Sequence, residues 1–367
     1  METIRGSAPI SRAEISRRVG ISKPTVSLAL QSLLEAGLVR ETAHDPGRPS
    51  YGAVYFEPVA EAALVLGLDL GAYFLRGAIC DLRGDIRARQ DVEIAGADAP
   101  TALDAVAALR SALVEASGLR TELLDGVVMG VPGVVEADTG RIELATNIPG
   151  LEGRPFAVEL GERLGLPVAL DNDINLAALG EQWRGVARGV ADFVFLSIGT
   201  GLGAGLVLGG ELHRGRHGAA GELDYARAGR EDDIDPCAGA ISAFAAQVAA
   251  RGGTELAPPY EPRAIFAAAR SGDPVAAAVV DEEARRIALH VVPIASVADV
   301  ALVVLGGGLG VNGDLLLEPV RRLLGEWLPY PPRVEVSSLG EAAVLTGALA
   351  VGVRAALDNV FANRARR

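Results

Sequence analysis

Three glycine-rich segments carry residue types that could bind an anion. Gly199-Thr200-Gly201-Leu202-Gly203 and Gly306-Gly307-Gly308-Leu309-Gly310 each follow an apolar run, and Asp69-Leu70-Gly71 ends a third one. Glycine lets the backbone approach a ligand closely, so the N–H groups of such a turn can cradle a phosphate. A single glycine-rich turn is weak evidence because glycine also serves ordinary tight turns. Three strand-to-turn units in one chain indicate phosphate-type loops, with Asp69, Gly71, Gly199, Thr200, Gly201, Gly307 and Gly308 as the candidate residues.

The first 58 residues contain the elements for a second kind of chemistry. Ser11-Arg12-Ala13-Glu14 is a capping box that starts a helix, and Gly20 ends that helix. Ser22 caps a second helix with Pro24 in its first turn, and Gly37 ends it. Apolar residues recur at helical spacing along both: Ile15, Val19, Val26, Leu30, Leu33 and Leu34. A short helix, a tight turn and a second helix form the helix-turn-helix pattern.

We therefore predict that this head binds double-stranded DNA. The outward residues near the start of the second helix would face the major groove: Ser22, Lys23, Thr25, Ser27, Leu28 and Gln31. The segments 38–40 and 54–56 can pair as a hairpin, with a wing at 45–49 between them. Arg48 lies there between Gly47 and Pro49, and a short, rigid cation of this kind suits a narrow minor groove. The alternative is a small helical interaction module with solvated arginines.

Winged helix domains normally have a helix before the capping box, and this sequence predicts none. Only ten residues precede Ser11, and residues 6–9 (GSAP) disfavour a helix. Either the first helix of the domain is truncated because the true start lies upstream, or the domain is stabilised in another way.

The charge distribution confines nucleic-acid binding to the head. The chain has 367 residues and a net charge of −13, yet residues 1–50 carry +2, which leaves −15 on the remainder. An acidic body repels phosphates. Two distant cysteines, Cys80 and Cys237, argue against a disulfide framework. No apolar run approaches the length of a membrane span, and the N-terminus has no secretion signal, so we expect a cytoplasmic protein with no membrane partner.

The larger part of the chain has the pattern of an α/β body. An apolar strand at 64–71, a second at 75–81, a turn at 83–85 and a third strand resemble the opening of the two-lobed actin-like (ribonuclease-H-like) ATPase fold. A helical segment at 99–119 and a buried strand at 125–133 follow. We predict a winged helix-turn-helix domain of the α+β type at 1–58, a first lobe at 59–171 completed by 345–367, and a second lobe at 172–344.

Several motifs together resemble the ROK family of repressors, uncharacterised reading frames and sugar kinases. They are SRAEIS with SKPTVS, the GRP wing, VPGVVEADTGRIELATNIPG, DNDINLAALGE, IGTGLGAGLVLGGEL with GAAGEL, and LGGGLGVNGDLLLEPV. The resemblance covers nearly the whole chain. Kinases of the family lack a DNA-binding head, so its presence is similar to regulators of the xylose-repressor type.

The resemblance implies a sugar site. In ROK kinases the pair that matches Asn172-Asp173 lies beside the sugar, with the aspartate as general base. Asn147 and Glu222 match further sugar-binding residues, and Tyr225 stands where the family has a histidine. A sugar offers only hydroxyls, so carboxylates and amides suit it. The alternative for Asn172 and Asp173 is a helix cap before Ile174, and both roles are compatible.

Two departures from the kinase pattern predict the loss of catalysis. The family continues its first phosphate loop with Gly-Thr, whereas Gly71 is followed by Ala72-Tyr73-Phe74. The zinc site of the family, a histidine after Gly-Glu-x-Gly and three cysteines, aligns with Tyr225, Asp233, Asp235 and Ala240, which are not soft zinc ligands. Cys237 is a leftover thiol. The acidic run of Asp232, Asp233 and Asp235 could attract a hard cation or simply be solvated, and we predict no metal and no cofactor.

The pocket has also changed its chemistry. Ser242 aligns with the last sugar-binding glutamate of the family. Arg214, Arg216 and His217 could bind an acidic sugar derivative or lie on a solvated loop. We therefore predict a sugar-responsive regulator that acts as a homodimer or homotetramer on a palindromic operator. The alternative is an active ROK-type sugar kinase, and a third possibility is a scaffold protein with neither activity.

Overall fold

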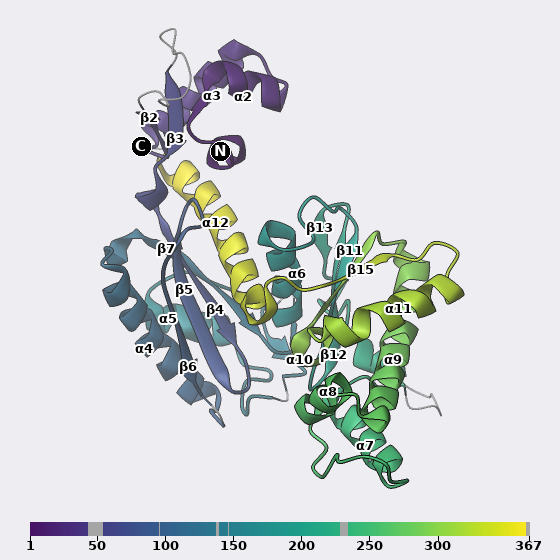
Figure 1. The fold of residues 1–367 in the computed structure, drawn as a ribbon. Coiled ribbons are helices and arrows are strands. Elements are labelled where there is room, and N and C mark those ends of the chain that lie inside the picture. The colour runs from purple at the N-terminus through teal and green to yellow at the C-terminus, as the bar shows by residue number, and fades with distance from the viewer. Residues whose placement is uncertain (43–53, 95, 137–138, 146, 228–233, 365–367) are drawn as a thin grey trace. The chain divides into compact units, whose positions relative to one another are not determined.

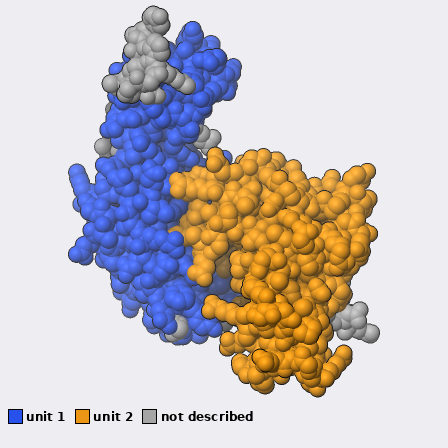
Figure 2. Space-filling model, viewed as in Figure 1, with its two compact units in different colours: residues 1–132, 144–170, 348–367 blue, residues 133–143, 171–347 orange. Residues whose placement is uncertain are grey.

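The computed structural model describes residues 1–42, 54–94, 96–136, 139–145, 147–227 and 234–364. The chain divides into two compact units, coloured separately in Figure 2. Unit 1 comprises residues 1–132, 144–170 and 348–367, and unit 2 comprises residues 133–143 and 171–347. Each unit is built from segments that are distant in sequence. The predicted limits of the three domains remain predictions.

The head of unit 1 has the helix-turn-helix that the sequence predicts. Its elements are α1 (Glu2–Arg5), β1 (Ile10–Ser11), α2 (Arg12–Val19), α3 (Lys23–Glu35), β2 (Val39–Thr42) and β3 (Tyr55–Pro58). The Ser11 side chain accepts the N–H of Glu14, Gly20 ends α2 in the left-handed conformation, and Ser22 accepts the N–H of Thr25. Both predicted helix starts are therefore confirmed. Arg48 and the rest of the wing lie outside the described residues.

The head is closed by a small sheet and a very short first helix. β3 pairs antiparallel with both β1 and β2, which confirms the predicted hairpin and adds a strand to it. α1 has four residues, and its Ile4 is 3% exposed. A buried cluster joins these elements and consists of Ile4, Ile10, Ile15, Val26, Leu30, Val39 and Phe56. The head thus has an apolar core in which strand β1 and one helical turn stand before α2.

The rest of unit 1 is a five-stranded sheet with helices beside it (Figure 1). Its strands are β4 (Leu64–Leu70), β5 (Phe74–Asp81), β6 (Ile86–Glu93), β7 (Leu124–Val131) and β10 (Val168–Asn172), in the order β10-β7-β4-β5-β6. β4 is antiparallel to β5 but parallel to β7. The helices are α4 (Ala99–Ser117), α5 (Phe156–Leu164) and most of α12 (Ala343–Arg364). The predicted opening strands and the helix after them are confirmed.

Unit 2 has a second five-stranded sheet, in the order β13-β12-β11-β14-β15. The strands are β11 (Phe193–Ile198), β12 (Leu202–Leu208), β13 (Glu211–His213), β14 (Leu302–Gly306) and β15 (Arg333–Val336). The helices are α6 (Asp173–Arg184), α7 (Ala238–Ala249), α8 (Pro262–Arg270), α9 (Pro274–Ala298), α10 (Gly307–Gly310) and α11 (Gly313–Trp327). β8 (Val134–Val135) and β9 (Ile142–Glu143) form a separate hairpin. Short 3₁₀ turns occur at Ala60–Ala62, Thr121–Leu123, Leu223–Arg227 and Gly340–Ala342.

The sheet of unit 2 is buried on both faces. Successive side chains of a strand point to opposite faces. Val194 and Leu196 of β11 belong to one buried cluster with Ile287 of α9, whereas Phe193 and Phe195 belong to another with residues of α6. Figure 1 shows α6 and α9 on opposite sides of this sheet. A strand buried on both faces reads as a continuous apolar run, and the run 193–198 does so.

The expectation that no apolar run approaches the length of a membrane span was wrong. The stretch Gly340–Val360 has 21 residues and contains an 18-residue window with a mean hydropathy of 1.4, so by length and composition alone it could cross a membrane. Half of it is buried inside the structure, with Leu349 and Val353 of α12 in the core. Core helices of folded proteins pass the same test, and α12 is one of these.

Helix α6 packs against the start of α12 at backbone distance. A Cβ atom on Gly347 would lie 1.8 Å from the carbonyl oxygen of Leu176, and one on Gly180 would lie 2.3 Å from that of Ala343. Real Cβ atoms cannot come so close to backbone oxygens, so only glycine fits these two positions. The contact fixes α6 through the backbone, which cannot rearrange as a side chain can.

We expect Gly347→Ala to destabilise the protein by about 1–3 kcal/mol, the usual cost of overpacking a core. The measurement is the Tm of the full chain. The control is Gly325→Ala near the end of α11, where no atom lies within 4 Å of the added methyl and the change should stabilise by ~0.5 kcal/mol. If Gly347→Ala melts at or above the temperature of the wild type, the close contact is not a constraint.

Candidate functional site

The predicted DNA-binding residues lie along the exposed side of α3. Ser27 is half-buried. The other five are exposed: Ser22, Lys23, Thr25, Leu28 and Gln31. Some of these side chains also hold the helix together. Ser22 Oγ is 2.7 Å from Thr25 Oγ1 and caps the helix, and Ser27 Oγ donates to the carbonyl of Lys23 at 2.9 Å. Their assignment to DNA remains a proposal.

Leu28 is the notable residue of this helix surface. It is 68% exposed although Val26 and Leu30 on either side are buried. A leucine that the core does not use can contact the methyl group of thymine in the major groove. The surface of α3 therefore offers one cation, several hydroxyl or amide groups and one apolar contact, which is the mixture that base readout requires.

In unit 1, Asp69 is paired with an arginine on the neighbouring strand. Asp69 of β4 lies opposite Arg76 of β5, which lies opposite Asp91 of β6. Arg76 Nη1 donates to Asp69 Oδ2 at 3.3 Å, and its Nε is 3.7 Å from Asp91 Oδ2. Asp69 is 5% exposed. Its charge is thus compensated by a residue of the sheet, a pairing that the sequence analysis missed because it depends on strand register.

The first predicted phosphate loop presents aromatic side chains. Gly71 donates its N–H to the carbonyl of Phe74 at 2.9 Å, which closes a tight turn. Tyr73 and Phe74 are exposed on this turn, and the Arg76 guanidinium lies 5.4 Å from the Phe74 ring centre. Asn147, the predicted sugar ligand of unit 1, is exposed. The turn therefore offers bulky side chains where a phosphate cradle needs open backbone.

In unit 2, an ion pair positions the start of α6. Asp171 Oδ2 accepts from Arg214 Nη2 at 2.6 Å and from its Nε at 3.2 Å. Asp171 Oδ1 accepts the N–H of Asn172 and the side-chain amide of Asn175. Arg214, a candidate cation for an acidic ligand, is engaged by the Asp171 carboxylate. Arg216 and His217 are exposed.

Asn172 acts as the helix cap. Its Oδ1 accepts the N–H groups of Ile174 at 2.9 Å and Asn175 at 3.0 Å, and its Nδ2 donates to the carbonyl of Gly133 at 2.9 Å. The predicted cap is therefore confirmed for Asn172. Asp173, the next residue, is half-buried in the first turn of α6. The cap fixes the backbone on which the Asp173 carboxylate is carried.

The segment of Glu222 and the start of α6 both border Gly203 of strand β12. A Cβ on Gly203 would lie 2.3 Å from Ile174 Cδ1 and 3.7 Å from the carbonyl oxygen of Gly221, so Gly203 borders both segments. Burial raises the pKa of the Glu222 carboxyl, and the charge of Asp224 raises it further. Tyr225 is 61% exposed in the following 3₁₀ turn. Asp173 and Glu222 are thus brought to one region of unit 2.

The two glycine loops of unit 2 lie side by side. Strands β11 and β14 are parallel neighbours with Ser197 opposite Gly306, so both chains turn at the same edge of the sheet. A Cβ on Gly199 would lie 3.8 Å from the nitrogen of Gly308. Crevices at the carboxyl ends of parallel strands are the usual ligand sites of open α/β sheets. A cavity of about 450 Å³ opens there, lined in part by Arg263, Phe266, Arg270, Gly307, Gly308 and Asn312.

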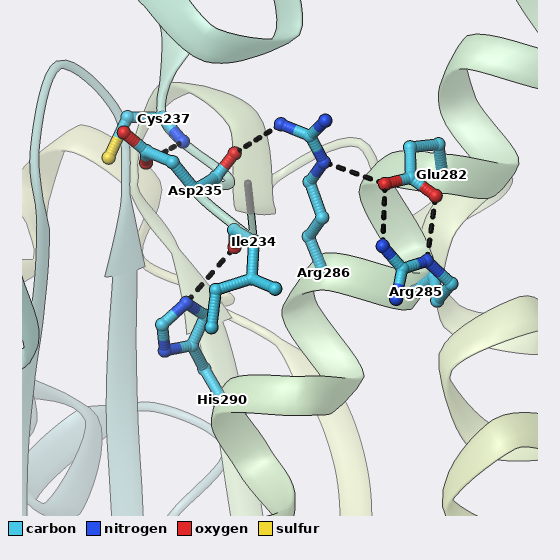
Figure 3. Close-up of polar contacts among 7 residues, drawn as sticks. All are labelled: Ile234, Asp235, Cys237, Glu282, Arg285, Arg286 and His290. Atoms are coloured by element: carbon cyan, nitrogen blue, oxygen red, sulfur yellow. Dashed lines mark hydrogen bonds and ion pairs between the residues drawn. The ribbon is translucent and has the colours of Figure 1, made fainter. Parts of the chain in front are cut away.

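The positions that the sequence analysis matches with the family's zinc ligands include side chains of other kinds. Tyr225 offers a phenol and Ala240 a methyl group, which do not suit zinc. Asp235 Oδ1 accepts the N–H of Cys237, and its carbonyl oxygen accepts from Arg286 Nη1 at 2.7 Å (Figure 3). His290 Nε2 is 3.2 Å from the carbonyl of Ile234. Side chains of α9 therefore hold this segment.

Among the described residues, no cluster of three or more His, Cys, Asp or Glu side chains could hold a metal ion. Asp232 and Asp233, which were considered for a hard cation, lie outside those residues. Ser242, which the resemblance matches with the family's last sugar-binding glutamate, is half-buried in α7.

Comparisons with known proteins agree with both parts of the chain. The ROK family model matches residues 65–355, and the MarR family model matches residues 2–48. A xylose repressor of Caldicellulosiruptor bescii is 27% identical over 373 residues, covering 96% of this chain and 93% of its own.

Two solved structures show the same fold. The first is a ROK family transcriptional regulator, a homologue of the E. coli MLC protein, with a TM-score of 0.81 and 23% identity over 99% of this chain and 96% of that one. The second is a ROK family glucokinase from Streptomyces griseus in complex with glucose and AMPPNP, with a TM-score of 0.67 and 29% identity over 80% of this chain and 100% of that one. The predicted fold class, a winged helix-turn-helix followed by an actin-like α/β body, is confirmed, and the chain belongs to the ROK family.

Proposed function

We propose that this protein is a sugar-responsive transcriptional regulator, a repressor of genes for carbohydrate uptake or catabolism. The observation that carries the proposal is the union of a complete helix-turn-helix with a ROK body in one chain that aligns over nearly its full length with a xylose repressor. We place the protein in the cytoplasm, where its operator DNA is.

We assign the sugar site to Asn147, Asn172, Asp173, Glu222 and Tyr225. Support comes from the resemblance of these positions to the family's sugar-binding residues and from the short path between α6 and the Glu222 segment. A carboxylate and an amide held on capped or hydrogen-bonded backbone can recognise hydroxyl groups by direction. The sugar can control DNA binding only if it binds two conformations with different affinity.

We further propose that the protein is not a kinase. Two features support this proposal: Asp69 is paired with Arg76, and Tyr73 and Phe74 are exposed on the turn that would hold phosphate. The alternative function, sugar phosphorylation, is favoured by the similarity to the glucokinase and by the presence of Asp173 in the matching position. We propose a homodimer or homotetramer, because a symmetric protein matches a palindromic operator.

For the head, we expect DNase footprinting upstream of the protein's own gene to show a two-fold symmetric protected site. Lys23→Ala and Arg48→Ala should each weaken binding about tenfold and lower the salt dependence by about one ion, since each removes one phosphate-neutralising cation. Arg322→Ala, which removes an exposed arginine of α11, is the matched control. Equal losses in all three variants would show a general charge effect, and unchanged binding in the first two would contradict the assigned DNA interface.

For the sugar site, we expect D-xylose or D-glucose to change the operator affinity of the wild type. In Asp173→Ala this response should fall at least about tenfold, because a hydrogen bond between a charged group and a hydroxyl is lost, while operator affinity without sugar stays the same. ATP turnover should be at background level in both proteins. Sugar-dependent ATP turnover that disappears in Asp173→Ala would establish the kinase alternative.

For Glu222, we expect Glu222→Gln to raise the Tm at pH 7.5. The raised pKa means that the folded state holds this proton more tightly than the unfolded state does, so stability is lost as pH rises above the ordinary glutamate value. Glutamine mimics the neutral form, and the gain should vanish below about pH 4. Glu162→Gln, at an exposed position of α5, is the control. A gain of the same size at both pH values would contradict the explanation.

A further inference from the structure

We propose that Arg286 and His290 of α9 act as positioning residues, and we call this pair the α9 anchor. The anchor fixes the segment 234–237 and, through it, the glycine loop 199–203 that borders the candidate sugar site. The fixing of the segment concerns unit 2 alone and holds whether or not the head binds DNA. Its effect on the sugar response rests on the proposed function.

Both members of the α9 anchor donate to backbone carbonyl groups of the segment (Figure 3). Arg286 Nη1 donates to the carbonyl oxygen of Asp235 at 2.7 Å. His290 Nε2 lies 3.2 Å from the carbonyl oxygen of Ile234 and is the donor, since a carbonyl oxygen can only accept. Arg286 is 3% exposed and His290 is 4% exposed, so both hydrogen bonds lie in the interior, where they are strongest.

The Arg286 side chain is itself held on two sides. Its Nε donates to Glu282 Oε1 at 2.9 Å, and Glu282 also accepts two hydrogen bonds from Arg285. On α7, the Phe244 ring centre lies 5.2 Å from the guanidinium carbon. The planar fork of a guanidinium can bridge a carboxylate and a carbonyl at the same time. The segment is therefore bonded to a side chain that has little freedom to move.

The start of α7 passes this constraint to the glycine loop. Asp235 Oδ1 accepts the N–H of Cys237 at 2.9 Å, which closes a turn directly before the helix. The next N–H, that of Ala238, donates to the carbonyl oxygen of Gly199 at 2.8 Å. The place of Gly199 thus depends on where the α9 anchor holds the segment.

The glycine loop leads into β12, which borders two parts of the candidate sugar site. The Ala204 N–H donates to the carbonyl oxygen of Gly221 at 2.9 Å, immediately before Glu222. On the same strand, Gly203 lies against the Ile174 side chain of α6. A shift of the loop would therefore reach both carboxylate-bearing segments of the site.

The segment itself is tested by hydrogen–deuterium exchange of the full chain. We expect His290→Leu and Arg286→Met to raise the exchange rate of the Cys237 and Ala238 amides at least about tenfold, because each variant loses a buried hydrogen bond that keeps the segment closed. Glu282 keeps Arg285 as a partner in Arg286→Met.

Two matched variants separate a lost hydrogen bond from a general loss of packing. His290→Gln offers an amide donor in place of Nε2, and its exchange should stay within about twofold of the wild type. Arg322→Met removes an exposed arginine of α11 and should leave exchange in the segment unchanged.

The same variants test the sugar response. In His290→Leu and Arg286→Met, the concentration of D-xylose or D-glucose that half-saturates the change in operator affinity should rise at least about tenfold, because displaced carboxylates lose their directed hydrogen bonds. Operator affinity without sugar should equal that of the wild type. His290→Gln should retain the wild-type response.

Ala238→Pro tests the link to the glycine loop without a change in the buried anchor. It removes the N–H that reaches Gly199. Proline suits the first position of a helix, and Cys237 before it is already extended (φ −74°, ψ 159°), so α7 should form and the Tm should stay near that of the wild type. We expect the same weakened sugar response, and this variant decides the case if a substitution at the anchor prevents folding.

The proposal is overturned if His290→Leu and Arg286→Met exchange like the wild type, or if His290→Gln loses as much as His290→Leu. An unchanged sugar response in Ala238→Pro overturns it as well. So does faster exchange of the wild-type segment after treatment with EDTA, because a metal ion would then be the anchor. A wild type that responds to neither sugar would contradict the proposed function, while the exchange rates would still show whether the anchor holds the segment.

Discussion

Helix α6 is held between two backbones, and the candidate site depends on this constraint. On one side, Gly203 and Gly205 of β12 leave room for Ile174 and Ala178, and on the other Gly347 of α12 meets the carbonyl of Leu176. A larger side chain at Gly205 or Gly347 would meet backbone oxygens of α6 and push the helix away, and one at Gly203 would displace the end of the Ile174 side chain. Because the helix has so little freedom to shift, its first turn carries Asp173 at a fixed place, and the Asn172 cap completes the arrangement.

Two buried carboxylates of the folded body, Asp69 and Asp171, are compensated by arginines. Arg76 bridges Asp69 and Asp91 across three strands, and Arg214 holds Asp171. When a partly buried charge has a partner of opposite sign, the attraction between them offsets part of the free-energy cost of removing the charge from water. The same pairing turns residues that could meet a ligand into structural elements. Resemblance in a motif therefore does not by itself transfer the chemistry of a related enzyme, because a neighbouring residue can engage the key side chain.

The division of charge between the parts of the chain suits a regulator. The head carries the residues that we propose to face DNA, while the remainder is strongly acidic. An acidic body repels the phosphate backbone, and this agrees with the proposal that the head makes the DNA contacts.

The sequence by itself determined the local elements and the family. Ser11, Ser22 and Asn172 cap helices as predicted, and the apolar run 193–198 became a strand buried on both faces. These features depend on residues close together in the chain, so pattern and propensity suffice. Tertiary structure alone decided the pairing of Asp171 with Arg214, 43 residues away, and the close approach of Gly347 to Leu176. Such contacts depend on strand register and on how turns bring distant segments together, and no local pattern encodes either.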